Sequence, residues 1–135
     1  MSRRSARELC MKILYEMEIK KEFDRKVLMT NEEYKVIKTE EDLYMENVID
    51  HFINNQRIVD EILESHLTDW KLNRISKVDL SILRVATVEI LFIPEIDSNV
   101  SINEAIEITK SYSEDKSAKY INGVLDSIAT EKQSS

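Results

Sequence analysis

Glycine and proline are almost absent from this chain, whose 135 residues include one of each, Gly123 and Pro94. Average usage is about 7% glycine and 5% proline. Sheet proteins need tight turns, and tight turns depend on glycine, proline and Asn-Gly pairs. The scarcity therefore predicts an all-α fold, in which helices are joined by polar linkers.

Length, cysteine content and hydropathy narrow the class of protein further. A chain of 135 residues corresponds to one domain and can bury a core of its own. Cys10 is the one cysteine, so an internal disulfide is excluded and a reducing compartment is favoured. No apolar run approaches the ~20 residues of a membrane span, and no apolar segment follows the charged N-terminus as in a signal peptide. We therefore expect a cytoplasmic protein with no membrane partner.

The N-terminal segment carries one apolar stripe at helical spacing, which begins at Ala6 and ends at Met17. Ser5 and Glu8 have the spacing of a capping box, in which each side chain bonds a free N–H at the helix start. We therefore expect the helix to start near Ala6, and residues 1–5 to form an arm before it.

The segment that follows is less regular. Residues 22–41 have many charges and no clean period, and we expect a loop there, with or without a helical stretch. A stripe that starts at Met45 and ends at Leu67 predicts a long helix with a polar break at residues 54–56. The chain is then expected to turn near Trp70.

Residues 78–93 are apolar on every side of a helix, which is typical of a helix in the middle of a protein. Arg84 and Glu89 would be partly buried charges on this helix and would need partners. Pro94 is expected to end it.

Two more helices are expected towards the C-terminus. Ser101 and Glu104 have the spacing of a second capping box, and a last apolar stripe ends at Ile128. A tail of about residues 130–135 follows. Gly123 lies inside the last helix, where glycine costs about 1 kcal/mol relative to alanine, a cost that a close helix–helix contact would justify.

The sequence offers no constellation for catalysis, for a metal or for a cofactor. His51 and His66 have no Cys or His neighbours at ligand spacing, and Cys10 lies on an apolar stripe. One glycine cannot build a phosphate-binding loop. We therefore expect a protein that is not an enzyme.

Charge is unevenly distributed along the chain, whose formal net charge is −7. Residues 22–69 hold 13 Asp/Glu and 5 Lys/Arg, whereas the remainder holds 13 acidic and 14 basic residues. Arg3, Arg4 and Arg7 cluster at the start of the first helix, where the helix dipole disfavours cations. A bound phosphate would relieve this conflict. Solvated arginines are the alternative.

Two further features suggest partners. Tyr112, Lys116, Lys119 and Tyr120 lie around the junction of the last two helices. Aromatic residues interleaved with lysines can stack bases and neutralise phosphates of single-stranded nucleic acid, although four such residues are more often ordinary surface residues. Tyr15 lies opposite the apolar stripe of the first helix, which suggests either a protein contact or a solvated surface tyrosine.

Three stretches, taken in order, resemble the NusB family of bacterial transcription antitermination factors. They are RRSARELCMKILYEME, VDLSILRVATVEILF and VSINEAIEITKSYSEDKSAKYINGVLDSIA, and INEAIEITK and KYINGVLD are the most specific parts. The resemblance covers nearly the whole chain except roughly residues 20–60. It implies a single helical domain, residues 1–135, of about seven helices in two small bundles.

The resemblance also implies a function. Family members bind the boxA segment of nascent RNA jointly with NusE, a ribosomal small-subunit protein. The complex helps RNA polymerase, with other Nus factors, through ribosomal RNA operons. By this resemblance RNA is expected to contact Arg3, Arg4, Arg7, Tyr112, Lys116 and Tyr120, and NusE is expected to contact Tyr15 and Asp79. Cys10 stands where alanine is common, and Ser113 where glycine is common, which leaves the path of that loop open.

Two alternatives to an RNA-binding factor follow from the same residues. The first is a helical adaptor that binds proteins without direct RNA binding, which the acidic net charge favours. The second is a helical domain of the kind attached to RNA methyltransferases, which is disfavoured because this chain has no room for the catalytic domain.

Overall fold

The computed structural model describes residues 1–36, 40–67 and 72–134. This part of the chain contains seven α-helices, one 3-10 helix and no strand, so the prediction of an all-α fold is confirmed. The helices are α1 (Arg3–Lys20), α2 (Arg25–Met29), α3 (Glu32–Val36), α4 (Glu41–Ser65), η1 (Leu72–Arg74), α5 (Lys77–Phe92), α6 (Ser98–Tyr112) and α7 (Asp115–Ser134). The turn expected near Trp70 lies outside the described residues.

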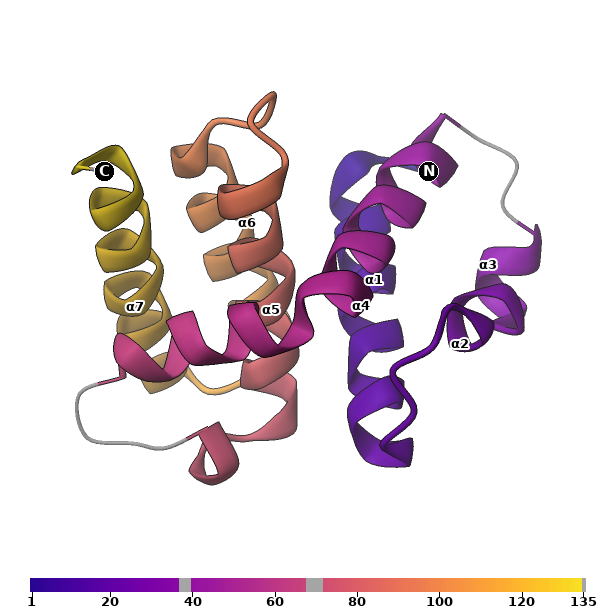
Figure 1. The fold of residues 1–135 in the computed structure, drawn as a ribbon, viewed down its shortest axis with the longest axis horizontal. Helices are drawn as coiled ribbons and strands as arrows, with labels where there is room; N and C mark the ends of the chain where they lie inside the picture. Colours follow the sequence, from indigo (N-terminus) through magenta and orange to yellow (C-terminus); the bar gives the residue numbers. More distant parts are fainter. Residues whose placement is uncertain (37–39, 68–71, 135) are drawn as a thin grey trace.

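The helices form two groups, which confirms the prediction of two small bundles (Figure 1). One group contains α1, α2, α3 and the first half of α4, and the other contains α5, α6, α7 and the second half of α4. Helix α4 passes between them and bends at Asn55, whose φ of −130° and ψ of 22° are not helical. The Asn55 side-chain amide donates to the His51 carbonyl oxygen at 2.9 Å. The polar break expected at residues 54–56 is therefore a kink within a continuous helix.

Helix α5 is the central helix of the molecule, as its sequence predicts. Every residue from Asp79 to Ile90 is buried, because α1, α4, α6 and α7 all pack against this helix. The buried apolar side chains of α1, α2, α4, α5, α6 and α7 form one hydrophobic core.

The charge on Arg84, near the middle of α5, has the partners that its burial requires. Its guanidinium donates to Glu18 on α1 at 2.7 Å, and to both carboxylate oxygens of Asp60 on α4 at 2.7 and 3.0 Å. The rings of Phe23 and Phe52 flank it, with centroids 5.7 and 5.1 Å away. Arg84 therefore connects three helices through charged hydrogen bonds.

Helix α1 begins three residues earlier than its sequence predicts. The Ser5 N–H donates to Ser2 Oγ at 3.1 Å, so Ser2 is the N-cap residue, and the capping box predicted at Ser5 and Glu8 is wrong. Ser2 and Ser5 both have the side chain that an N-cap needs. The cap at Ser2 adds about one turn of hydrogen-bonded helix, which a cap at Ser5 would lack. Arg3 and Arg4 consequently lie in the first helical turn rather than on an arm.

Helix α6 also begins earlier than expected. Asp97 is its N-cap residue and accepts from the Asn99 N–H at 2.8 Å. Ser101 and Glu104 therefore lie inside the helix, and the second predicted capping box is wrong as well. Both side chains instead bond to residues of other helices, described below.

The irregular segment 22–41 contains the two short helices α2 and α3. Asp24 caps α2 by accepting from the Lys26 N–H at 2.7 Å. Val27 and Leu28 are buried where α2 packs against α1 and α4. These two residues fix the segment to the core, although its sequence shows no helical period.

Helix α7 continues to Ser134, so the tail expected from about residue 130 is helical up to that point. No close contact with another helix of the described structure accounts for Gly123. Gly123 is exposed, and a Cβ placed on it would meet no atom within 4 Å.

Candidate nucleic-acid interface

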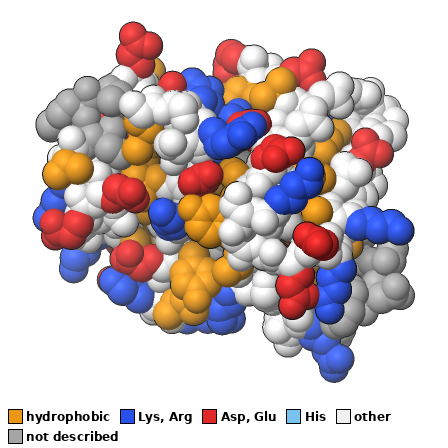
Figure 2. Space-filling model, turned by 180° about the vertical axis from the view of Figure 1, so that it is seen from behind, with side chains coloured by type: hydrophobic (Ala, Val, Ile, Leu, Met, Phe, Trp, Pro, Cys, Tyr) orange, Lys and Arg blue, Asp and Glu red, His pale blue; other side chains and the backbone are white. Residues whose placement is uncertain are grey.

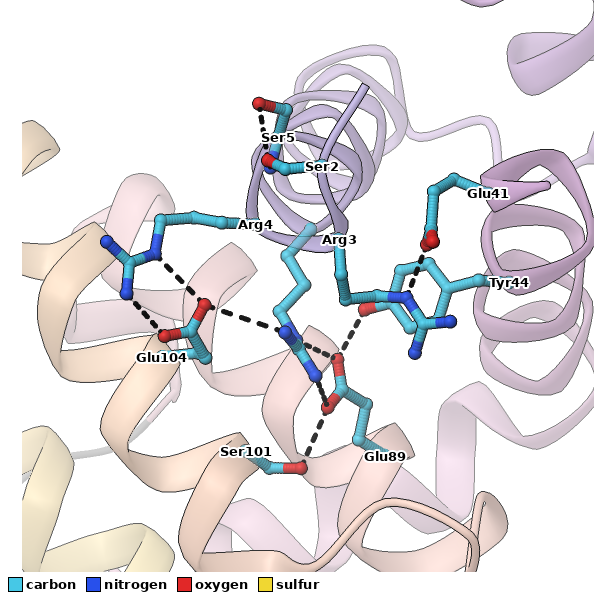
Figure 3. A network of polar contacts seen from close by, with 10 residues as sticks. Ser2, Arg3, Arg4, Ser5, Glu41, Tyr44, Glu89, Ser101 and Glu104 are labelled. Carbon is cyan, nitrogen blue, oxygen red and sulfur yellow. Dashed lines mark hydrogen bonds and ion pairs between the residues drawn. The ribbon is translucent and has the colours of Figure 1, made fainter. Parts of the chain in front are cut away.

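The two arginines of the first turn of α1 point to opposite neighbours (Figure 3). Arg3 donates from Nε to Glu41 of α4, and its guanidinium lies over the Tyr44 ring, 4.3 Å from the centroid. Arg4 donates to both oxygens of Glu104 on α6, from Nε at 3.0 Å and from Nη2 at 2.6 Å. Both arginine side chains are partly exposed, so solvent reaches them.

Arg7, one turn further along α1, is buried and only 5% exposed. It donates to both oxygens of Glu89 on α5, at 2.8 and 3.1 Å. The Glu89 carboxylate also accepts from the Tyr44 hydroxyl and, at 2.8 Å, from Ser101 Oγ (Figure 3). The three clustered arginines are therefore not equivalent: Arg3 and Arg4 face outward, whereas Arg7 joins α1, α4, α5 and α6 in the interior.

The pKa values of the network follow from these contacts. Burial disfavours the charged form of Arg7, but the hydrogen bonds and charge of Glu89 outweigh burial and raise the pKa of Arg7. The hydrogen bond from Arg4 holds the pKa of Glu104 below its usual value. Burial raises the pKa of Tyr44, whose neighbour Glu89 adds to the effect. At neutral pH Arg4, Arg7 and Glu104 are therefore charged, and Tyr44 is a neutral donor.

A side chain from α6 covers the outer face of α1. Arg4, Glu8 and Lys12 are spaced four residues apart, so they share one helix face. The Tyr112 hydroxyl donates to Glu8 at 3.2 Å, and the Lys12 ammonium lies 5.9 Å from the centroid of the Tyr112 ring. The fold thus brings exposed Tyr112 beside the helix that carries Arg4.

Lys12 is a candidate site residue that our sequence analysis did not include. Its place eight residues after Arg4 on the same helix face is the signal that could have identified it. Its position over an aromatic ring that is far away in sequence could not have been read from the local pattern.

The junction of α6 and α7 is held against the start of α5 by Asp79. Its two carboxylate oxygens accept from Ser113 Oγ at 2.6 Å and from Ser117 Oγ at 2.8 Å. Asp79 is 5% exposed, so this carboxylate has a role inside the protein, and its contact with NusE stays a prediction. The Ser113 hydroxyl also fixes the path of the loop that the sequence left open.

The remaining predicted RNA contacts lie on the first turns of α7. Lys116 and Lys119 are exposed, and Lys116 lies 3.3 Å from Glu114. Tyr120 is half-buried and packs against the core, and burial raises its pKa. Among the described residues, the Tyr120 hydroxyl has no hydrogen-bond partner. The structure therefore places both lysines at the surface and Tyr120 partly buried against the core, with its hydroxyl buried.

Tyr15, the other predicted protein contact, is exposed on α1. Ile19 is exposed one turn later on the same face, next to charged residues at the end of the helix. Figure 2 shows the molecule from the side of α1, where groups of hydrophobic side chains lie among both signs of charge. An exposed tyrosine and isoleucine in this position can serve as a protein contact.

The described residues provide neither a metal site nor a membrane span. No three His, Cys, Asp or Glu side chains among them gather as they would around a metal ion. None of the described helices combines the length and apolar character needed to cross a bilayer.

Comparison with known proteins identifies the family. Residues 4–130 match the model of the NusB family. The chain is 45% identical over 133 residues to the transcription antitermination protein NusB of Clostridium novyi, covering 93% of this chain and 96% of that protein. The structure of T. maritima NusB matches with a TM-score of 0.86 at 35% identity, over 97% of this chain and 92% of that chain.

A further solved structure shares the fold. It is a crystal structure of the antitermination factors NusB and NusE in complex with dsRNA, with a TM-score of 0.82 at 23% identity over 96% of each chain. Because the family model matches almost the full length and a relative is 45% identical over nearly all of it, this chain belongs to the NusB family.

Proposed function

We propose that this chain is a transcription antitermination factor that binds boxA-type single-stranded RNA together with NusE. The complex then supports transcription of ribosomal RNA operons by RNA polymerase with other Nus factors, in the bacterial cytoplasm. Family membership carries the proposal, because the relatives at 44–45% identity are transcription antitermination proteins and not enzymes. A solved structure of the same fold contains NusB and NusE in complex with dsRNA.

The arrangement of the side chains supports RNA as a ligand. We define the RNA surface as Arg3, Arg4, Lys12, Tyr112, Lys116, Lys119 and Tyr120. Its exposed cations can neutralise phosphates, and the exposed ring of Tyr112 can stack on a base. The interior contacts of Arg7 and Asp79 hold the helices that carry this surface, so we assign them positioning roles.

NusE is assigned to a neighbouring part of α1. Tyr15 and Ile19 are exposed there, close in sequence to Lys12 of the RNA surface. Tyrosine is among the residues enriched at protein interfaces. A protein bound at Tyr15 would therefore sit beside bound RNA and could contact it as well.

We predict that NusE strengthens RNA binding, because this chain alone offers the RNA few cations and carries a net charge of −7. Coupling between two ligands is reciprocal, so RNA should strengthen NusE binding by the same factor. The measurement is filter binding of a boxA-type RNA with and without NusE, at several salt concentrations. Equal RNA affinities at every salt concentration would contradict the proposal.

The adaptor remains a second candidate, and one observation favours it. Arg3, Arg4 and Arg7 all have carboxylate partners within the protein, so none of them needs a phosphate for neutralisation. The same experiment separates the two functions, since an adaptor would bind NusE without adding to the RNA affinity of NusE alone.

A further inference from the structure

The proposed phosphate contact Arg4 is already occupied by a carboxylate of the same protein. The first turn of α1, which is described in full, contains no Asp or Glu, so the partner comes from elsewhere in the fold. That partner is Glu104 of α6, a hundred residues away in sequence. The Arg4 side chain is 52% exposed and that of Glu104 is 18% exposed. The pair therefore lies at the surface, where RNA can reach the arginine.

The geometry of this pair matches the way in which arginine binds phosphate. Glu104 accepts from Nε and Nη2 of Arg4, at 3.0 and 2.6 Å, so two parallel hydrogen bonds occupy one edge of the guanidinium. A phosphate uses the same two parallel donors when it binds arginine in a bidentate manner. The carboxylate and an RNA phosphate are therefore alternative occupants of this edge.

Glu104 has a second cation beside it, which makes the exchange possible. Nη1 of buried Arg7 lies 3.6 Å from Glu104 Oε1. If Arg4 moves to a phosphate, the carboxylate keeps Arg7 as a neighbour and is not left as an unpaired charge. Glu104 Oε1 thus lies within 3.0 Å of Arg4 Nε and 3.6 Å of Arg7 Nη1.

We propose that Glu104 competes with RNA for Arg4, so that this carboxylate limits the RNA affinity of the protein. In the free protein Arg4 is bound to Glu104, and in the RNA complex it turns to a phosphate while Glu104 stays beside Arg7. This inference rests on the proposed function and adds a residue that sets the strength of RNA binding.

The test is the RNA affinity of Glu104→Gln in the presence of NusE, measured with a labelled boxA-type RNA. Glutamine keeps the shape and one acceptor but removes the charge that holds Arg4. Exposed ion pairs are weak, so we expect the variant to bind RNA about two- to fivefold more tightly. Thermal melts check that the variant folds.

Glu107→Gln is the matched control, because it removes the same charge from the same helix. Glu107 lies 3.5 Å from Lys110 and has no hydrogen bond to Arg4 in the described structure, and its charge acts on Arg4 less than that of Glu104 does. The gain in affinity should be larger for Glu104→Gln than for Glu107→Gln. In an Arg4→Ala background the two gains should become equal.

Three other results would overturn the inference. Equal gains for the two variants in the wild-type background would mean that only overall charge matters. Weaker RNA binding by Glu104→Gln would mean that Glu104 positions Arg4 for RNA rather than competing with it. An Arg4→Ala variant with unchanged RNA affinity would remove Arg4 from the RNA surface. The proposed function itself would be contradicted by a different result, in which the wild-type protein adds nothing to RNA binding by NusE.

Discussion

Arg7 and Glu89 form the most heavily bonded charge pair in the interior. Both side chains are nearly fully buried, and Glu89 accepts four hydrogen bonds from three residues. A buried charge is tolerated only when its partner and further hydrogen bonds replace the lost water. The pair therefore fixes how α1 sits against α5, and with it the direction in which Arg3 and Arg4 leave the helix.

We predict that Arg7→Ala is strongly destabilising. It leaves the Glu89 carboxylate buried without its cation, a change that typically costs about 3–5 kcal/mol. Urea unfolding of the variant and the wild type measures the difference. Arg3→Ala is the control and should cost less than about 1 kcal/mol, because the Arg3–Glu41 pair is partly exposed. Equal midpoints for Arg7→Ala and the wild type would contradict the internal role of Arg7.

At the level of single residues, the sequence was informative about surface position and not about partners. It correctly required partners for Arg84 and Glu89, since two charges on an apolar helix must be neutralised. The sequence could not show that Arg7 is the partner of Glu89, because 82 residues separate the two. For the same reason the sequence could not show that the hydroxyls of Ser113 and Ser117 bond to Asp79, which lies more than 30 residues away from both.

The helices themselves were largely predictable, whereas their first residues were not. Apolar stripes and the scarcity of glycine reflect packing and backbone preference, which act along the whole length of a helix. A helix start depends on one side chain, and several serines and acids had suitable spacing. Ser101 and Glu104 fit the capping pattern, yet each side chain bonds to a residue of another helix. A local sequence pattern cannot predict such contacts.

Gly123 destabilises helix α7, and no contact with another part of the described structure compensates for this cost. Gly123 is helical and exposed, and a Cβ placed there would meet no atom within 4 Å. We predict that Gly123→Ala raises the free energy of unfolding by about 1 kcal/mol, because alanine restricts the unfolded chain and favours helix. Thermal or urea unfolding measures the gain. A loss of stability would show that the glycine has a role in the folded chain that its surroundings do not reveal.

For the whole molecule, the acidic net charge and RNA binding are compatible because the charges are separated. The acidic excess lies in residues 22–69, whose described part contains α2, α3 and α4, whereas the RNA surface lies on α1, α6 and α7. Arg4, one of the cations of the RNA surface, is paired with Glu104 in the free protein. The proposed RNA binding therefore depends on a small set of exposed cations rather than on the overall charge of the protein.

The most direct test of this account is the salt dependence of RNA binding for a variant of the RNA surface. Arg3, Arg4 and Lys12 are exposed, so replacing all three by alanine should leave the fold intact. Each neutralised phosphate of single-stranded RNA contributes about 0.7 to the slope of log affinity against log salt. Losing three contacts should therefore reduce the magnitude of the slope by roughly 2.

The control is a second triple variant, in which Lys20, Lys35 and Arg57 are replaced by alanine. These cations are also exposed, and each has a nearby carboxylate on its own helix. Both triple variants lose three positive charges, so they change the net charge by the same amount. RNA affinity is measured against salt for both variants and the wild type, with NusE present and with thermal melts of each protein. We predict a slope lower by roughly 2 for the first variant and an unchanged slope for the control. Identical slopes for all three proteins would contradict the assignment of RNA binding to this surface.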